Sequence, residues 1–449
     1  MKRSALAGGA LAVVVFLIAL GVALRTLGLR RPSNHRAAIP VSGAAFEETH
    51  ESFLYGRVAT VDDAVFEGRL RWGGSQEAFW GDYFNGAKKG NPWAAHVPPE
   101  RLPKERHSIR IFGLEFGERE NPAALNRLFM ARYGDIAGIE AAGREVRVTL
   151  KSGTTFVLDR FSASDFDDGL RVWDATRGVT DLDSLRIGAI GLRSSPSRGV
   201  VPHRLYGTVQ TAHGAFTGFL QWNREECLGS DELDSRTAEG KRSFRFDTVR
   251  SIERHSSDSS RVTLIDGRAA LLSGTNEAGE GNRGVYVDDA RYGRVLVSWD
   301  AFRRVDFSSG GGAGPAYGDF PPGGPLTGAV TTRGGRRLAG RLVYDLDETE
   351  VTETLDAPSQ GVTYTIPFGL IAAIANPAAE GGGAQSVMVT LHSGERLHLE
   401  RAGDLGPNHA GILVFSDGRE RPEYVPWAEV ERVDLNRPHA MFPEIGRAR

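Results

Sequence analysis

The feature that most constrains the fold is a short stretch that occurs three times in the chain. Its copies read LYGRVATVDDAVFEGRLRWG from Leu54, LYGTVQTAHGAFTGFLQWN from Leu205 and LTGAVTTRGGRRLAGRLVYD from Leu326. In every copy an aromatic residue lies four positions after the second glycine, and these aromatics are Trp72, Trp222 and Tyr344. A pattern that returns at matched anchor positions indicates an internal repeat.

The residues that follow each copy also repeat, and they do so in the same order. A second segment reads VRVTLKSG at 146–153, RVTLIDG at 261–267 and VMVTLHSG at 387–394. The repeated aromatic precedes a repeated isoleucine by 30 positions in copies two and three, but by 67 in copy one, from Trp72 to Ile139. The chain therefore contains three copies of a two-part unit, and the first copy carries about 37 additional residues.

Each copy alternates apolar and polar residues with period two, as at 147–150 and 208–211. This alternation is typical of half-buried strands. Dipeptides that end in glycine, such as Asp266-Gly267 and Ser393-Gly394, supply tight turns between these strands. Short strands at regular spacing predict a mainly β fold built from tandem small β-barrels. The hairpin, with its V-x-T strand, turn and G-x-L-x-W strand, resembles the first motif of Sm-like and SH3-like small barrels. That resemblance implies a similar fold, but the second Sm motif, with its RNA-contacting Arg-Gly, is not recognisable.

The N-terminus contains 20 residues without charge, from Ala5 to Leu24. At about 1.5 Å per helical residue, such a segment spans a bilayer core of about 30 Å. Arg25 follows the apolar run directly, and the site lacks the small residues of a cleavage signal. We expect an uncleaved, single-pass signal anchor, with cleavage as the alternative. The body is expected outside the cytoplasm, in the periplasm or at the cell surface.

These signals divide the chain into seven segments. The predicted segments are an anchor at 1–30, a polar stalk at 31–52, repeat 1 with its insertion at 53–193, repeat 2 at 204–307, a Gly/Pro linker at 308–325, repeat 3 at 326–436 and a tail at 437–449. The linker is expected to be flexible because it is rich in glycine and proline.

Composition narrows the classes of function. The chain has 54 basic and 57 acidic side chains, a net charge of −3, which does not predict binding to nucleic acid. Cys227 is the single cysteine, so an intramolecular disulfide is excluded. Neither a metal site, a cofactor site nor a catalytic residue is predicted.

Three acidic segments are candidate sites. The segment SASDFDDG at 163–169 lacks the spacing of a calcium loop and is interpreted as a turn. The carboxylates at 225–226 and 345–350 follow the repeated aromatic and could act in acid–base chemistry. An acidic rim on an exposed hairpin is the preferred interpretation, and the repeated aromatics are expected to fill the core.

The insertion in repeat 1 is the predicted partner-binding segment. It combines aromatic and basic side chains, the residue types found at interface hot spots. The candidate residues are Trp80, Tyr83, Phe84, Lys88, Lys89, Trp93, Arg101, Lys104 and Arg106. An insertion that only covers its own barrel is the alternative.

The sequence as a whole predicts a membrane-anchored, non-enzymatic protein whose repeated barrels bind a protein or an envelope ligand. One alternative is a hydrolase of the cell envelope with its site between barrels. The other is an RNA-binding adaptor that faces the cytoplasm.

Overall fold

The computed structural model describes residues 49–438 except 74–75, 103, 112–113, 123–127, 162, 198–202, 238 and 379–385. The predicted anchor at 1–30, the stalk up to residue 48 and the tail from residue 439 lie outside this range. Among the described residues, no helix is long and apolar enough to cross a bilayer.

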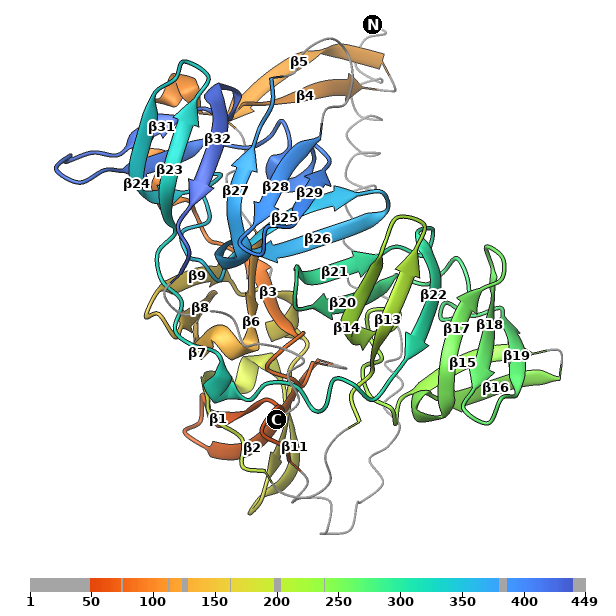
Figure 1. The fold of residues 1–449 in the computed structure, drawn as a ribbon. Helices are drawn as coiled ribbons and strands as arrows, with labels where there is room; N and C mark the ends of the chain where they lie inside the picture. Colours follow the sequence, from red (N-terminus) through yellow and green to blue (C-terminus); the bar gives the residue numbers. More distant parts are fainter. Residues whose placement is uncertain are drawn as a thin grey trace, which may run out of the picture. The chain divides into compact units, whose positions relative to one another are not determined.

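The described chain is mainly β, as predicted, and the same order of ten strands occurs in each repeat (Figure 1). Repeat 1 contains β1 (Tyr55–Thr60), β2 (Val65–Trp72), β3 (Tyr83–Ala87), β6 (Leu128–Arg132), β7 (Ile136–Ala142), β8 (Glu145–Leu150), β9 (Thr155–Asp159), β10 (Leu170–Asp174), β11 (Gly178–Leu182) and β12 (Ile187–Leu192). Repeat 2 contains β13 (Tyr206–Thr211), β14 (Ala215–Gln221), β15 (Glu232–Thr237), β16 (Gly240–Arg245), β17 (Val249–Arg254), β18 (Ser259–Leu264), β19 (Ala269–Ser273), β20 (Val285–Asp289), β21 (Gly293–Val297) and β22 (Phe302–Phe307). Repeat 3 contains β23 (Thr327–Thr332), β24 (Arg337–Val343), β25 (Thr354–Ser359), β26 (Val362–Pro367), β27 (Ile371–Ala375), β28 (Val387–Leu391), β29 (Arg396–Leu399), β30 (Ile412–Phe415), β31 (Glu423–Val425) and β32 (Val430–Leu435).

Eight strands of each repeat pair in one antiparallel order. In repeat 1 this order is β11-β10-β2-β1-β12-β7-β8-β9, and repeats 2 and 3 follow it with the corresponding strands. Among the described residues, none of these ladders closes on itself. The structure therefore shows multistranded open sheets and does not confirm the predicted tandem barrels.

The repeated second glycine of the hairpin is explained by a close approach between strands. A Cβ atom at Gly218 in β14 would lie 2.0 Å from the carbonyl oxygen of Asp288 in β20. At the matching Gly68 and Gly340 the nearest carbonyl oxygens would lie at 1.9 and 2.1 Å. Any larger residue would push the paired strand away, so glycine is required at this position in all three repeats.

The repeated aromatics fill the cores, as predicted. Trp72, Trp222 and Tyr344 are each at most 1% exposed. Trp222 packs edge-to-face against Trp299 and Phe302, which come from the closing segment of repeat 2. The aromatic position is therefore conserved between the repeats because it plugs the interior.

Repeats 2 and 3 are joined by strand pairing. The hairpin β25–β26 of repeat 3 lies beside β21 of repeat 2, so that one sheet of twelve strands contains residues of both repeats (Figure 1). One hydrophobic cluster also runs through both repeats, from Leu205 to Leu435. In repeat 1 the corresponding hairpin, β3–β6, forms a ladder of its own.

The predicted linker packs on repeat 1. The ring of Tyr317 lies 5.0 Å from that of Phe79, and Phe320 lies 6.0 Å from Trp80. The Lys151 ammonium donates hydrogen bonds to the carbonyl oxygens of Tyr317 and Phe320 at 2.6 and 3.0 Å. Two aromatic residues thus hold a segment that its glycine and proline content predicted to be flexible.

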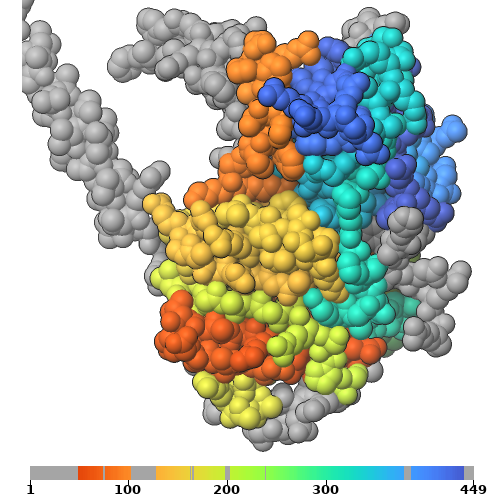
Figure 2. Space-filling model, turned by 90° about the vertical axis from the view of Figure 1, so that its left-hand side faces the viewer, coloured from red at the N-terminus to blue at the C-terminus, as the bar shows by residue number. Residues whose placement is uncertain are grey.

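The insertion lies between β3 and β6, where repeats 2 and 3 have tight turns. It contains two short 3₁₀ helices, Pro92–His96 and Pro99–Arg101, and the hairpin of β4 (Lys104–Ile111) and β5 (Leu114–Pro122). Trp93 and Val97 share a small apolar cluster with residues of repeat 3, including Leu413. Figure 2 shows the segment near residue 100, in orange, against repeat 3, in cyan and blue.

Candidate functional site

The first three predicted partner-binding residues are buried. Trp80, Tyr83 and Phe84 are 4%, 2% and 0% exposed. Trp80 and Phe84 belong to the hydrophobic core of repeat 1, and the ring of Tyr83 lies against Arg294 of repeat 2. In this conformation they present no aromatic surface to another molecule. The prediction that they are surface anchors is therefore corrected, because the β3 segment folds into the core instead of extending from it.

The other predicted residues have different surroundings. Trp93 is half-buried and packs edge-to-face on Phe415 of repeat 3. Lys89 is exposed and pairs with Glu145, and Arg101 is also exposed. The side chains of Lys104 and Arg106 lie outside the described structure. A partner-binding role for Lys89, Trp93, Arg101, Lys104 and Arg106 stays a prediction.

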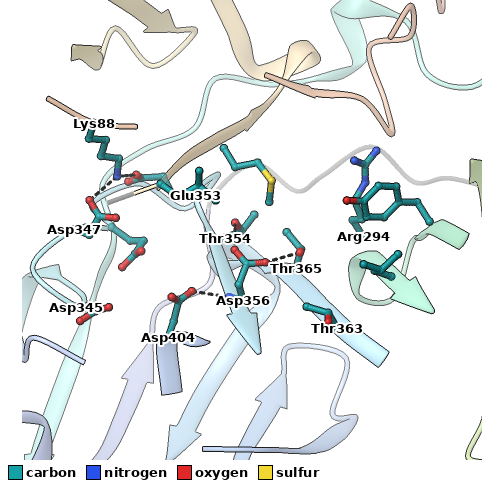
Figure 3. Close-up of a pocket in the computed structure, with 15 residues that line it drawn as sticks. Lys88, Arg294, Asp345, Asp347, Glu353, Thr354, Asp356, Thr363, Thr365 and Asp404 are labelled. Carbon is teal, nitrogen blue, oxygen red and sulfur yellow. Dashed lines mark hydrogen bonds and ion pairs between the residues drawn. The ribbon is translucent and has the colours of Figure 1, made fainter. Parts of the chain in front are cut away.

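Lys88 lies in a pocket of about 460 Å³ to which all three repeats contribute (Figure 3). The lining residues are Lys88, Leu128 and Met130 from repeat 1, Tyr286, Arg294 and Leu296 from repeat 2, and Asp345, Asp347, Glu348, Glu353, Thr354, Asp356, Thr363, Thr365 and Asp404 from repeat 3. Six of the fifteen side chains are carboxylic acids.

Strand register builds one wall of the pocket. Arg294 in β21 lies opposite Thr365 in β26, and Thr365 lies opposite Asp356 in β25. Residues directly opposite each other point to the same face of a sheet. Since neighbouring strands are about 4.8 Å apart, Arg294 and Asp356 are separated by about 10 Å along this row. Figure 3 shows the row with Arg294 at one end and Asp356 at the other.

The turn after the repeated aromatic residue brings acidic residues to the pocket. After Tyr344, Asp345 and Leu346 both adopt left-handed backbone conformations, with φ of 51° and 53°. Aspartate tolerates this region better than most residues, and two such residues in succession form a tight hairpin turn. Two backbone hydrogen bonds of 2.9 Å between Tyr344 and Glu348 then fix the backbone of Glu348 beside that of Tyr344.

One end of the acidic cluster is neutralised by Lys88. Its ammonium contacts Glu353 Oε1 at 2.6 Å and Asp347 Oδ1 at 2.8 Å. The other oxygen of Glu353 accepts hydrogen bonds from the backbone N–H groups of Thr349 and Glu350. Burial alone would lower the pKa of Lys88, but Glu353 and Asp347 hold it above its ordinary value. This group is a fixed, buried ion pair.

The next two carboxyl groups, those of Asp356 and Asp404, are half-buried, and each accepts a hydrogen bond from the hairpin β25–β26. The backbone N–H of Asp356 donates to Asp404 Oδ2 at 2.6 Å, and Thr365 donates to Asp356 Oδ1. Burial raises the pKa of both Asp356 and Asp404, and in Asp404 the nearby Asp356 carboxylate adds to the effect. Both groups therefore hold their protons more tightly than ordinary aspartates do.

Glu348 differs from its neighbours because its side chain lacks a fixed partner. The residue is 8% exposed, and among the described residues Oε2 of Glu348 has no hydrogen-bond partner. Burial raises the pKa of Glu348 well above its ordinary value, and the nearby Asp347 and Asp404 raise it further. A buried carboxyl group without a partner is costly, so it marks a place where a ligand group can bind.

Repeat 2 has the same arrangement at the same positions. Glu226 corresponds to Glu348, and Glu277 corresponds to Asp404, because it accepts from the backbone N–H of Asp234 as Asp404 does from Asp356. Burial raises the pKa of Glu226 to about 8 and that of Glu277 to about 7. The carboxyl pair is thus shared by repeats 2 and 3, whereas repeat 1 has Gln76 at the position of Glu348.

The preferred interpretation of residues 345–350 as an exposed acidic rim was wrong. Asp345, Asp347, Glu348 and Glu350 are between 3% and 8% exposed. Lys88 pairs with Asp347, Thr154 of repeat 1 donates to Glu350, and the backbone N–H of Ala410 donates to Asp345. Sequence reasoning also missed Arg294, which becomes part of the site only through the pairing of β21 with β26. The run of acidic residues after Tyr344 was the sequence feature that could have indicated this site.

Within the described ranges, no group of three or more His, Cys, Asp or Glu side chains is arranged to hold a metal ion. The SASDFDDG segment forms the short helix α2 (Ser164–Asp167), and Cys227 is buried. Comparison of the chain with models of protein families, with curated proteins and with solved structures found no match.

Proposed function

We propose that the chain is a membrane-anchored binding protein whose three barrel-like repeats lie outside the cytoplasm and hold a ligand in the pocket that they share. The observation that supports this proposal is the joint lining of the pocket, with Lys88 from repeat 1, Arg294 from repeat 2 and Asp404 from repeat 3. Ligand sites are commonly concave regions between structural units, with a few fixed polar groups. A volume of about 460 Å³ suits a small organic molecule.

The pocket combines the features that a specific binding site needs. Leu128, Met130 and Leu296 provide apolar surface, and the threonines of β25 and β26 provide hydroxyl groups. The charged groups are held by neighbouring side chains and backbone, so they are oriented before a ligand arrives. A scaffold that only joined repeats would have no need of an open volume at their junction.

Binding can be tested on the full chain in detergent. Thermal unfolding is measured with amino acids, amines, sugars, carboxylates and divalent cations added one at a time. Leu128→Trp should block the pocket and abolish any stabilisation, since Leu128 is 66% exposed and lines the rim. Leu271→Trp is the matched control, because Leu271 is 51% exposed on a strand of repeat 2 that does not line the pocket. Failure of all these ligands to shift unfolding would contradict a binding role.

The expected membrane topology is tested separately. In intact cells with a permeable outer layer, added protease should digest the repeats while a cytoplasmic marker survives. The mature chain should still contain residues 5–24. A protected body would place the pocket on the cytoplasmic side and contradict this part of the proposal.

The converging carboxyl groups favour a hydrolase as a second candidate function. A buried acid with a raised pKa, such as Glu348, can donate a proton, and an ionised acid held by a cation, such as Asp347, can act as a base or nucleophile. The test incubates the full chain with purified envelope polysaccharide and measures new reducing ends. Release that Glu348→Gln abolishes would support an enzyme, and no release above the protein-free blank would remove this candidate.

A further inference from the structure

Two buried side chains that line the pocket, one acidic and one basic, each have a polar atom without a partner among the described residues. Glu348 is 8% exposed and Arg294 is 7% exposed. Among the described residues, neither Oε2 of Glu348 nor Nη2 of Arg294 has a hydrogen-bond partner. Glu348 belongs to the acidic group at one end of the pocket, whereas Figure 3 shows Arg294 at the other end, beyond Thr365. Each group is able to make one more strong hydrogen bond.

We infer that the ligand is a basic amino acid or a similar aliphatic amine that carries a carboxylate. Its ammonium group pairs with Glu348, and its carboxylate pairs with Arg294. This inference rests on the proposed binding function and adds the chemical class of the ligand.

The charges of the lining select a cation. Six carboxylic acids face the pocket, and Lys88 and Arg294 are its two basic residues. Lys88 itself shows which cation fits, because its primary ammonium contacts two of these carboxylates at 2.6 and 2.8 Å. The ammonium group of the ligand at Glu348 would form the same kind of ammonium–carboxylate pair as Lys88 forms within this cluster.

Arg294 is positioned to bind a carboxylate. Its guanidinium group lies 4.4 Å from the ring centres of both Tyr83 and Tyr286, and Asp288 accepts its Nε–H at 3.1 Å. These contacts fix the plane of the guanidinium group and leave Nη2 for a further acceptor. Planar arginine donors match the two oxygens of a carboxylate.

The row along the sheet gives the length of one wall of the pocket. Arg294 and Asp356 are about 10 Å apart across β21, β26 and β25. Thr365 lies between them, and Leu296 and Thr363 form the adjacent row of the same face. An amino acid with a long, flexible side chain lies along these rows, with apolar methylene groups on Leu296 and Met130.

Isothermal titration of the full chain in detergent tests the inference. The probes are L-lysine, cadaverine, which lacks the carboxylate, and hexanoate, which lacks the ammonium. We expect L-lysine to bind most tightly, cadaverine at least about tenfold more weakly, and hexanoate not at all. Glu348→Gln, an isosteric change, should weaken L-lysine at least about tenfold.

The outcomes separate this inference from the proposed function. Equal binding of hexanoate and L-lysine, or unchanged L-lysine affinity in a folded Glu348→Gln variant, would overturn it. Binding of calcium, magnesium or a neutral sugar in place of L-lysine, lost on Leu128→Trp, would also overturn it while leaving the pocket as a binding site. No binding of any probe would overturn both proposals.

Binding of the amine should depend on pH. Glu348 faces Asp345, Asp347, Asp404 and Lys88, and its raised pKa means that a proton must leave before an ammonium group can pair with it. The affinity for L-lysine should therefore rise with pH above the range in which an ordinary carboxyl group titrates, as long as the side-chain ammonium of lysine stays charged. A flat profile would show that Glu348 does not contact the amine.

Discussion

Replacing Lys88 by methionine tests whether the insertion joins repeat 1 to repeat 3 through a buried ion pair. Methionine keeps most of the aliphatic stem and removes only the charge. The Lys88 side chain is 12% exposed, and those of Asp347 and Glu353 are 7% and 6% exposed. The substitution therefore leaves two buried carboxylates without their cation.

The expected loss of stability is large because the charges are desolvated. Removing one partner of a buried ion pair costs about 3–5 kcal/mol. Acid protonates carboxylates and so removes the charges that need a cation. The difference in stability between the parent and Lys88→Met should therefore shrink as the pH falls towards the ordinary carboxyl range, at about 4.

Urea unfolding of the full chain, followed by tryptophan fluorescence, measures this effect. Lys89→Met is the matched control, because the neighbouring Lys89 has a side chain that is 50% exposed and pairs with Glu145 at the surface. The control should unfold almost like the parent, since exposed ion pairs contribute little. Equal behaviour of the two variants, or a loss that does not change with pH, would refute the buried ion pair.

Three further predictions concern the repeats. Gly218→Ala should destabilise the protein by about 3 kcal/mol or more in urea unfolding, because the new Cβ meets a backbone oxygen. Gly214→Ala, where the Cβ would point into open space, should leave the stability nearly unchanged. Equal effects of the two substitutions would contradict the explanation of the repeated glycine. Trp80→Ala should lower the free energy of unfolding by about 3–5 kcal/mol, and an unchanged stability would place Trp80 outside the core. Trp93→Ala should instead increase protease cleavage within the insertion. A fragment of residues 325–436 should give a dispersed NMR spectrum if repeat 3 folds alone, and a collapsed spectrum would show that it needs β21 of repeat 2.

The sequence predicted what depends on local pattern. Alternation of apolar residues and glycine turns gave the β class, and the matched anchors gave the three repeats. The plug role of Trp222 also followed from its position after the hairpin. These features arise within one repeat, where sequence neighbours are also neighbours in space.

Contacts between repeats could not be predicted in this way. The pairing of β21 with β26 joins residues that are about 70 positions apart, and nothing in either strand marks the other as its partner. The linker composition suggested separate modules, but Tyr317 and Phe320 attach it to repeat 1. Glu348 is buried in the folded protein, and nothing in the acidic run after Tyr344 predicts that burial.

The insertion shows why composition alone misplaces a site. Its aromatic and basic residues matched an interaction surface, and part of that surface exists within the chain. Lys88 and Trp93 contact repeat 3, while Trp80 belongs to the core of repeat 1. Residue type indicated an interaction but could not tell an internal contact from an external partner.

The most direct test of the shared pocket is a photo-crosslinking map. The full chain is irradiated with a lysine analogue that carries a diazirine in its side chain, and the modified peptides are identified by mass spectrometry. The account predicts labelling around Met130, Leu296 and Thr363, one site from each repeat, and competition by unlabelled L-lysine. Labelling confined to a single repeat, or labelling that excess L-lysine does not reduce, would contradict a ligand site formed by all three repeats.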